Sequence, residues 1–178
     1  MTDTPYADRE RSGTRYYRDS IAKMREAVAE FQRADLDFII ELGDMKDTTA
    51  RSEPVPTLRF LDDIEREFSA FRGPCYHVLG NHDMDCLSKE EFLAHTRNAG
   101  RARGKAFYSF SEGGVRCIVL DANFNEDRTP YARGNFDWRK AYIPTSQIEW
   151  LDRELTRHAD EPTLVFLHQM LDSFSDIS

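Results

Sequence analysis

Hydrophobic and polar positions along the chain follow two alternating patterns. Over residues 15–33, apolar side chains recur every three or four positions, which predicts an amphipathic helix with one buried stripe: Ile21, Met24, Val28 and Phe31. The next apolar runs are short, rich in branched and aromatic residues and closed by glycine, so residues 36–42 and 75–79 are predicted to be strands. Helical and strand patterns that alternate in this way indicate an α/β protein.

The rest of the chain continues this alternation. Further helices are predicted by an apolar stripe over residues 58–71 and by two capping-box pairs: Ser88 with Glu91, and Ser146 with Glu149. Residues 107–111 and 115–120 flank a pair of glycines and predict a β-hairpin, and residues 163–167 predict a last strand. Because the hairpin adds an antiparallel pair to crossover-connected strands, the β-structure is expected to be mixed.

Composition and charge narrow the classes of function. The 178 residues include 24 Lys or Arg and 32 Asp or Glu, and the net charge of −8 argues against a protein that wraps nucleic acid. No apolar run approaches the ~18 residues that a membrane span requires. The three cysteines are scattered, which predicts neither a disulfide framework nor a cysteine zinc site: Cys75, Cys86 and Cys117. We therefore expect an acidic, cytoplasmic domain whose partners include neither a membrane nor a nucleic acid.

Polar residues gather where the predicted strands end. Such residues follow four strands, two of them closed by glycine, in the segments 43–47, 80–83, 121–123 and 168–169. In open α/β sheets, ligands bind beyond the carboxyl ends of the strands, so these side chains are expected to meet in one crevice. They are carboxylates, amides and imidazoles, which suit divalent Mn, Fe, Zn or Co. A metal site is therefore predicted at this edge.

Two of these motifs resemble the signature of a known family. Gly-Asp-x-x-Asp at 43–47, followed by Gly-Asn-His-Asp at 80–83, is similar to the calcineurin-like metallophosphoesterases. Those proteins are dinuclear metal hydrolases built from two packed mixed sheets flanked by helices. The opening Asp3-Thr4-Pro5-Tyr6-Ala7-Asp8, with residues 12–18 behind it, resembles the subgroup that contains Mn-dependent ADP-ribose/CDP-alcohol pyrophosphatases.

This resemblance implies a fold, a reaction and a set of metal ligands. It covers Asp3 to His168 and implies that residues 1–178 form a single, partial catalytic domain, a mixed β-sheet sandwich flanked by helices. The implied activity is hydrolysis of phosphoester or phosphoanhydride bonds in a small phosphorylated substrate such as a nucleotide. Two divalent ions are implied as cofactors, with manganese favoured over iron, zinc or cobalt. Asp44 resembles the carboxylate that bridges both ions, Asp3 resembles a ligand of the first ion, and Asn81 and His168 resemble ligands of the second.

The resemblance also implies roles for three residues that do not bind the metals. His82 resembles the imidazole that is not a ligand and that protonates or stabilises the leaving oxygen, with Asp83 orienting it. Asp47 is expected to support the ligands from outside the metal shell. These roles agree with elementary chemistry, because a carboxylate that holds an imidazole selects its tautomer and raises its pKa, which suits a proton donor.

The sequence also departs from the family pattern at both ends. The opening motif of the family usually reads Asp-x-His, whereas the third position here is Pro5, which cannot ligate a metal. Only Met1 and Thr2 precede Asp3, and no Gly-His-x-His follows His168. The ligand set is therefore expected to be short. A truncated or degenerate domain without turnover, serving as a binding module or being a gene fragment, stands as the alternative to the enzyme.

Several residues near the predicted site admit two interpretations. Four residues at the start of the first predicted helix have two interpretations: Arg15, Tyr16, Tyr17 and Arg18. They would clamp a phosphate and stack on a nucleobase, or the tyrosines would pack against the helix while the arginines remain in solvent. Asn123, like Asp121, would touch substrate or serve only as a turn after a strand. The remaining histidines are interpreted as structural: His77, His95 and His158.

Overall fold

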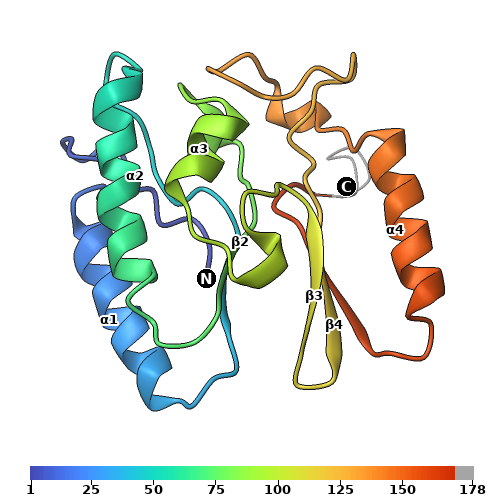
Figure 1. Cartoon of the computed structure of the whole chain (residues 1–178). Coiled ribbons are helices and arrows are strands. Elements are labelled where there is room, and N and C mark those ends of the chain that lie inside the picture. Colours follow the sequence, from blue (N-terminus) through green and yellow to red (C-terminus); the bar gives the residue numbers. More distant parts are fainter. Residues whose placement is uncertain (171–178) are drawn as a thin grey trace.

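The computed structural model describes residues 1–170, with the exception of the side chain of residue 101. Strands and helices alternate along the chain (Figure 1), in the order α1 (Asp19–Arg33), β1 (Ile39–Glu41), α2 (Pro54–Phe68), β2 (Cys75–His77), α3 (Lys89–His95), β3 (Tyr108–Glu112), β4 (Val115–Val119), α4 (Thr145–Arg157) and β5 (Thr163–Phe166). Single 3₁₀ turns lie over His82–Met84, Gly100–Ala102 and Trp138–Lys140.

The strands form two small sheets. β1 and β2 are parallel, with Ile39 opposite Cys75 and Glu41 opposite His77. In the second sheet β4 is central, because it pairs with β3 in an antiparallel hairpin and with β5 in parallel. The predicted α/β class and the mixed β-structure are therefore confirmed.

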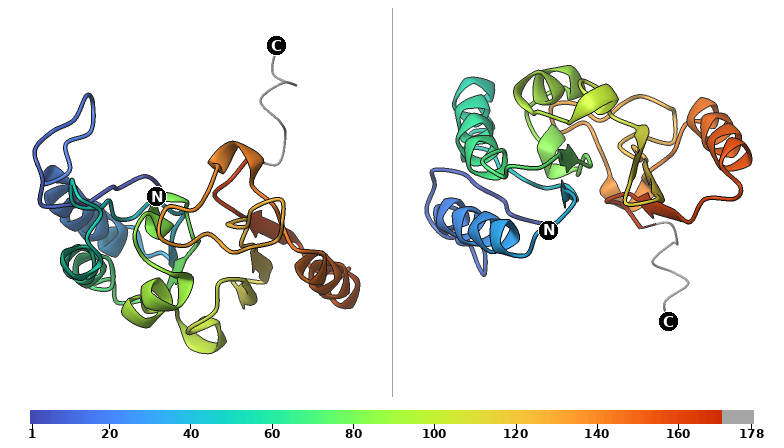
Figure 2. Two further views of the ribbon diagram at one scale, coloured as in Figure 1. Left: turned by 90° about the horizontal axis from the view of Figure 1, so that it is seen from above. Right: turned by 60° about the horizontal axis from the view of Figure 1, so that its bottom comes forward.

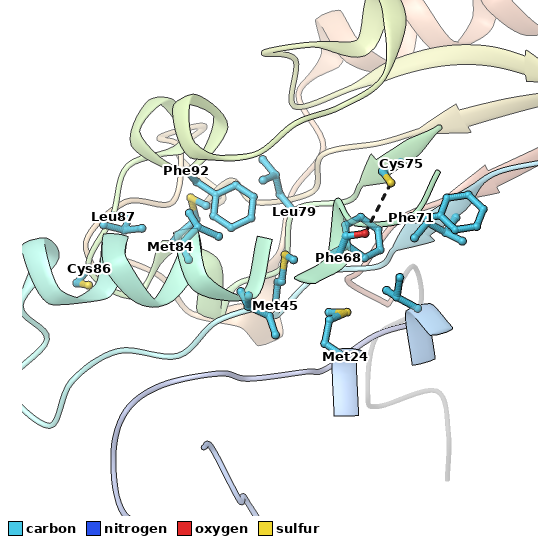
Figure 3. Close-up of a cluster of buried hydrophobic side chains, with 14 of the residues drawn as sticks. Met24, Met45, Phe68, Phe71, Cys75, Leu79, Met84, Cys86, Leu87 and Phe92 are labelled. Carbon is cyan, nitrogen blue, oxygen red and sulfur yellow. Dashed lines mark hydrogen bonds between the residues drawn. The ribbon is translucent and has the colours of Figure 1, made fainter. Parts of the chain in front are cut away.

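Apolar side chains fill the space between the first sheet and its helices. The stripes on α1 and α2 meet β1 and the loops after β1 and β2 in one buried cluster (Figure 3), which includes Met24, Met45, Leu61, Phe68, Leu79 and Phe92. Each large apolar side chain buried in this way contributes about 1.5–3 kcal/mol to folding. The strand-end loops are thus anchored by Met45 and Leu79, whose side chains belong to the core.

A second core lies between the two sheets. It joins Tyr76 of the first sheet to Tyr108 and Val119 of the second, and the rings of Tyr76 and Phe110 stack with their centroids 3.7 Å apart. Helix α4 lies beside the three-stranded sheet, far from α1 and α2 (Figures 1 and 2). The result is the expected sandwich of sheets flanked by helices. No helix in residues 1–170 is long and apolar enough to cross a bilayer.

Helix boundaries differ from the sequence pattern for local reasons. α1 begins at Asp19, later than expected, because Ser12 and Arg15 exchange backbone hydrogen bonds of 3.0 and 3.2 Å and hold the preceding segment in a turn. α2 begins earlier than its apolar stripe, at Pro54, since proline suits the first helical position.

One of the two predicted capping boxes forms. Ser88 and Glu91 exchange both expected hydrogen bonds, of 2.7 and 3.2 Å, at the start of α3. The Ser146–Glu149 box is wrong, because α4 already begins at Thr145 after Pro144 and Ser146 lies inside its first turn. A side chain in that position is past the point where it caps the first free amides.

Candidate metal centre

The loops that follow β1 and β2 meet at one edge of the first sheet. Gly43 has a φ of +99°, and a Cβ atom there would lie 2.6 Å from His168 Nδ1 and 2.7 Å from the Gly80 nitrogen. Gly80 in turn lies against the backbone nitrogen and side chain of Asp44. Both positions therefore require glycine, which is what lets the two loops and His168 come this close.

The N-terminal segment runs beside the first of these loops. The Asp3 amide donates to the Gly43 carbonyl at 3.1 Å, and Tyr6 exchanges hydrogen bonds with Met45 and Asp47. Backbone pairing of this kind fixes the place of Asp3, even though the paired stretch is too short to form a strand. The segment therefore delivers Asp3 to the same edge as Asp44.

Three of the four predicted metal residues come together here. Asp3, Asp44 and His168 offer ligand atoms that all lie within 4.8 Å of one another, with Asp44 buried and Asp3 exposed. His168 Nδ1 is 2.8 Å from the Leu42 carbonyl, and its Nε2 is 3.5 Å from Asp44 Oδ2. Metal-binding histidines are typically held in this way, with one ring nitrogen bonded to a carbonyl and the other facing the ion.

Asn81, the fourth predicted metal residue, is buried at the start of the 3₁₀ turn after β2. It directly precedes His82, whose amide donates to Asp44 Oδ1 at 2.8 Å. The backbone thus brings Asn81 to the Asp44 side of the site, next to the cluster of three.

Charges around the cluster reinforce one another. Burial acts to raise the pKa of the Asp44 carboxyl, but hydrogen bonding and charge from His168, followed by His82, bring it below its ordinary value. Burial acts to lower the pKa of His168, yet the hydrogen bond and charge of Asp44 raise it to about 9. Asp44 and His168 therefore form an ion pair.

The donor set fits a divalent cation. Besides Asp44, two fully buried carboxyl groups lie close enough for their charges to act on one another: Glu41 and Asp83. Burial, then the neighbouring carboxylate charge, raises the pKa of both groups. Neither oxygen of Glu41 has a hydrogen-bond partner in residues 1–170. A cation bound beside these groups would favour their ionised forms.

His82 is held by a different carboxylate from the expected one. Its Nδ1 lies 2.8 Å from Asp85 Oδ2, and the hydrogen bond that Nδ1 donates to Asp85 is the main reason that the pKa of His82 is raised. The prediction that Asp83 orients this ring is therefore wrong. The cause is the 3₁₀ turn at His82–Met84, in which residues three apart stack above one another.

Asp83 instead ties the two loops together. Its carboxylate is fully buried and accepts the backbone amides of Gly80 at 2.9 Å and of Asp44 and Met45 at 3.1 Å. Lys46, also fully buried, donates from its ammonium to the His82 carbonyl. The sequence offered one usable signal for these contacts, namely that Asp85 lies three positions after His82.

Arg15 links the His82 pair to Asp47. Its guanidinium lies 3.3 Å from Asp47 Oδ2 and 3.4 Å from His82 Nε2. Asp47, His82 and Asp85 also offer ligand atoms that lie within 4.8 Å of one another. Because the Arg15 guanidinium already approaches Asp47 and His82, this second group is arranged around a side-chain cation. Asp47 lies outside the Asp44 cluster and contacts Arg15.

A pocket of about 430 Å³ opens over both groups. Its walls include Asp3, Asp44, His82, Arg15, Tyr16 and Pro5. Two of the four candidate substrate residues before α1, Arg15 and Tyr16, therefore face the site.

The other candidate substrate residues lie outside this pocket. Tyr17 is buried under the Arg9 guanidinium, which lies 4.5 Å from its ring centroid, and Arg18 forms surface ion pairs with Asp8 and Glu10. Asn123 is buried, donating to the Leu79 carbonyl at 2.8 Å and accepting from Gln169 at 2.6 Å. For these three residues the structural interpretation holds.

The three remaining histidines have carboxylate partners away from the site. His77 is buried 2.8 Å from Glu65, while His95 lies 2.7 Å from Asp62 and His158 lies 2.7 Å from Glu161. The three cysteines are buried and free of disulfides.

Comparison with known proteins identifies the family. The model of the calcineurin-like phosphoesterases matches residues 13–176, and the chain belongs to this family. A manganese-dependent ADP-ribose/CDP-alcohol diphosphatase of Danio rerio is 31% identical in a gapped alignment of 219 positions that spans 94% of the chain and 68% of that protein. The protein of the same name from Arabidopsis thaliana is 38% identical over 109 residues, 60% of the chain but only 34% of that protein.

Solved structures show the same fold. A dimetal phosphatase from Danio rerio superposes with a TM-score of 0.73 at 25% identity, covering 94% of the chain and 68% of that structure. A purple acid phosphatase from yellow lupin, at 17% identity and a TM-score of 0.50, shares the fold alone. The chain thus spans from a third to two-thirds of the length of these relatives.

Proposed function

We propose that this chain forms the catalytic core of a metal-dependent hydrolase that cleaves phosphoester or phosphoanhydride bonds. The convergence of Asp3, Asp44 and His168 within 4.8 Å, beside a carboxylate-held His82, is the observation that carries the proposal. Membership of the calcineurin-like phosphoesterase family supports it. We extend the proposal to a cytoplasmic location and a single domain, as expected from the cysteines and the absence of linkers in the sequence.

Divalent ions, with manganese favoured, are the proposed cofactors. Asp44, Asp3 and His168 would hold an ion, with Asn81 beside them, and the manganese dependence named for the relatives supports this choice. When bound, such ions lower the pKa of coordinated water and neutralise phosphoryl oxygens. A second ion would need ligands in addition to this set, and Asp44, as a carboxylate with two oxygens, is suited to bridge it.

The chain's own residues supply the remaining chemistry. His82 has a raised pKa and is therefore protonated over a wider pH range, so its Nε2 is suited to donate a proton to the leaving oxygen. Asp85 accepts a hydrogen bond from Nδ1 at 2.8 Å, which orients the ring and favours its doubly protonated form. Arg15, 3.4 Å from the same Nε2, is placed to donate hydrogen bonds to phosphoryl oxygens, and Asp47 orients its guanidinium.

A small phosphorylated substrate, such as a nucleotide, suits the pocket. The pocket volume of about 430 Å³ falls in the range of small-molecule sites. Tyr16 lines the pocket and is half exposed, with the Arg11 guanidinium 5.2 Å from its ring centroid, so an aromatic ring and a cation stand together at the pocket wall where a base would stack. The names of the relatives refer to ADP-ribose and CDP-alcohols, which supports a nucleoside diphosphate derivative.

A second candidate function is binding without turnover. Pro5 favours it, because this residue lines the pocket at the place where the family pattern has a metal ligand, and proline has no side-chain donor. A domain of this kind would bind one ion through the Asp44 cluster and retain phosphorylated ligands without cleaving them.

Hydrolysis assays separate the two functions. The protein is incubated with Mn²⁺ and either bis-p-nitrophenyl phosphate or ADP-ribose, beside an Asp44→Ala variant, and bound metal is counted by elemental analysis. Activity above that of the variant supports the hydrolase, whereas activity equal to that of the variant overturns it. Two tightly held ions per chain would contradict the silent binding domain.

A further inference from the structure

Glu41 is a buried carboxyl group without a side-chain partner. It is fully buried at the end of β1, and neither of its oxygens meets a donor at good hydrogen-bond geometry in residues 1–170, although the Gly43 amide is close enough to favour its charged form. Leaving such a group unpaired in the interior is strongly unfavourable. A carboxyl group in this state stays uncharged unless a positive charge is bound nearby.

A second buried glutamate on the same side of the sheet shows the contrast. Glu41 pairs in register with His77, so both side chains lie on one face of β1 and β2. The His77 ring on that face is 2.8 Å from Glu65, whose other oxygen accepts the Arg97 amide at 3.0 Å. Glu65 thus has partners for both oxygens, and burial alone does not explain why Glu41 has none.

The surroundings of Glu41 are predominantly acidic. Its pKa is raised by burial first, then by the charge of Asp83 and further by that of Asp44, while the Gly43 amide and the amino group of Met1 oppose this only in part. Asp44, three residues further along, belongs to the cluster with Asp3 and His168. The charge of a cation bound in that cluster would act on Glu41 through a poorly solvated interior, where electrostatic interactions are strong.

We propose that Glu41 is a positioning residue for the metal, an internal carboxylate whose charge strengthens cation binding at Asp44 without coordinating the ion. This inference rests on the proposed function, since it requires a cation at Asp44. It goes beyond that function by assigning part of the affinity to a residue behind the ligands. Its consequence is that metal binding relieves an unfavourable interaction within the fold.

The test measures Mn²⁺ affinity and thermal stability of Glu41→Gln, which keeps the shape of the side chain and removes its charge. We expect roughly tenfold weaker Mn²⁺ binding by calorimetry, as one partly screened charge interaction predicts, and a metal-free melting temperature equal to or above that of the wild type. Glu65→Gln is the matched control, because it neutralises a buried glutamate whose partners are known. It should lower the melting temperature and leave the Mn²⁺ affinity unchanged.

The outcomes distinguish this inference from the proposed function. If Glu41→Gln binds Mn²⁺ as tightly as the wild type while Asp44→Ala does not bind it, the role of Glu41 is overturned and the metal site stands. If the wild type itself binds no Mn²⁺, the proposed function fails and the inference fails with it. Should Glu41→Gln fold poorly, Glu41→Met provides the same neutral test, and unchanged Mn²⁺ affinity in that variant also overturns the role.

Discussion

Two groups of buried polar residues flank strand β2, and they differ in how completely the chain satisfies them. On the strand itself, His77 contacts Glu65 at 2.8 Å and Asn98 at 3.1 Å, and Tyr108 donates to its carbonyl at 2.8 Å. Beyond the carboxyl end, Asp44 and His82 face a pocket, and Glu41 nearby has no partner.

This difference distinguishes buried polar residues that stabilise the fold from those that are suited to bind a ligand. A network whose members are all paired contributes to rigidity and to a unique packing, because breaking any pair leaves a buried group unsatisfied. A group left unpaired beside a pocket reduces stability unless a ligand completes it. Mutations should therefore affect stability in the His77 network and ligand chemistry at the Asp44 cluster.

The largest expected effect is on catalysis at Asp44. Asp44→Ala should abolish Mn²⁺ binding and lower hydrolysis of ADP-ribose by roughly a thousandfold or more, since metal-ion charge stabilisation is worth several kcal/mol. Steady-state assays and calorimetry measure both effects. Asp152→Ala, on the exposed side of α4, is the control and should behave as the wild type. An Asp44→Ala protein that retains Mn²⁺ binding would contradict the assignment.

Next in size is the loss of stability in the other group. Glu65→Leu should lower the free energy of unfolding by about 3 kcal/mol, because it leaves His77 buried without its carboxylate. Urea denaturation measures the change. Mn²⁺ affinity should remain that of the wild type, and a parallel loss of affinity would show that the two groups are not separable.

A smaller effect is expected at Asp85. Asp85→Asn should reduce kcat about tenfold, because His82 keeps its place but loses the charge that orients it and raises its pKa. The loss should be greater with ADP-ribose than with bis-p-nitrophenyl phosphate, whose nitrophenolate leaves without a proton. Equal losses on both substrates would argue against His82 as the proton donor, and Asp83→Asn should instead destabilise the loops.

The smallest effect concerns pH. Burial opposes protonation of His77, but the charge and hydrogen bond of Glu65 outweigh it and raise the pKa in the folded state above its ordinary value of 6.5. Protonated His77 therefore stabilises the fold fully below pH 6.5, and this contribution is lost as the pH rises through the raised pKa. The stability difference between wild type and Glu65→Leu, measured in urea with a chelator, should shrink as the pH rises. A difference that is independent of pH would exclude this linkage.

Much of the fold and of the site follows from local chemistry in the sequence. Periodicity located the helices and strands because burial of one face imposes a period of 3.6 or 2, and the Ser88–Glu91 box formed because both partners lie within one turn. Gly43 and Gly80 marked the loops, since residues without a side chain are needed where two backbones approach closely. Asp44 and His168 were predicted to be metal ligands from the same strand-end motifs, and the fold brings them together.

Contacts between distant or turn-dependent residues required the folded chain. Arg15 reaches Asp47 across 32 positions because a turn before α1 aims it there, while Tyr17 and Arg18 in the same segment face elsewhere. Asp85 rather than Asp83 holds His82 because of a single 3₁₀ turn. Nothing in the sequence distinguishes Glu41 from other polar residues in short strands, and only the packing of the folded chain shows that its carboxyl group lacks a side-chain partner. A sequence records which groups are available, whereas whether a buried group finds a partner depends on every element that packs around it.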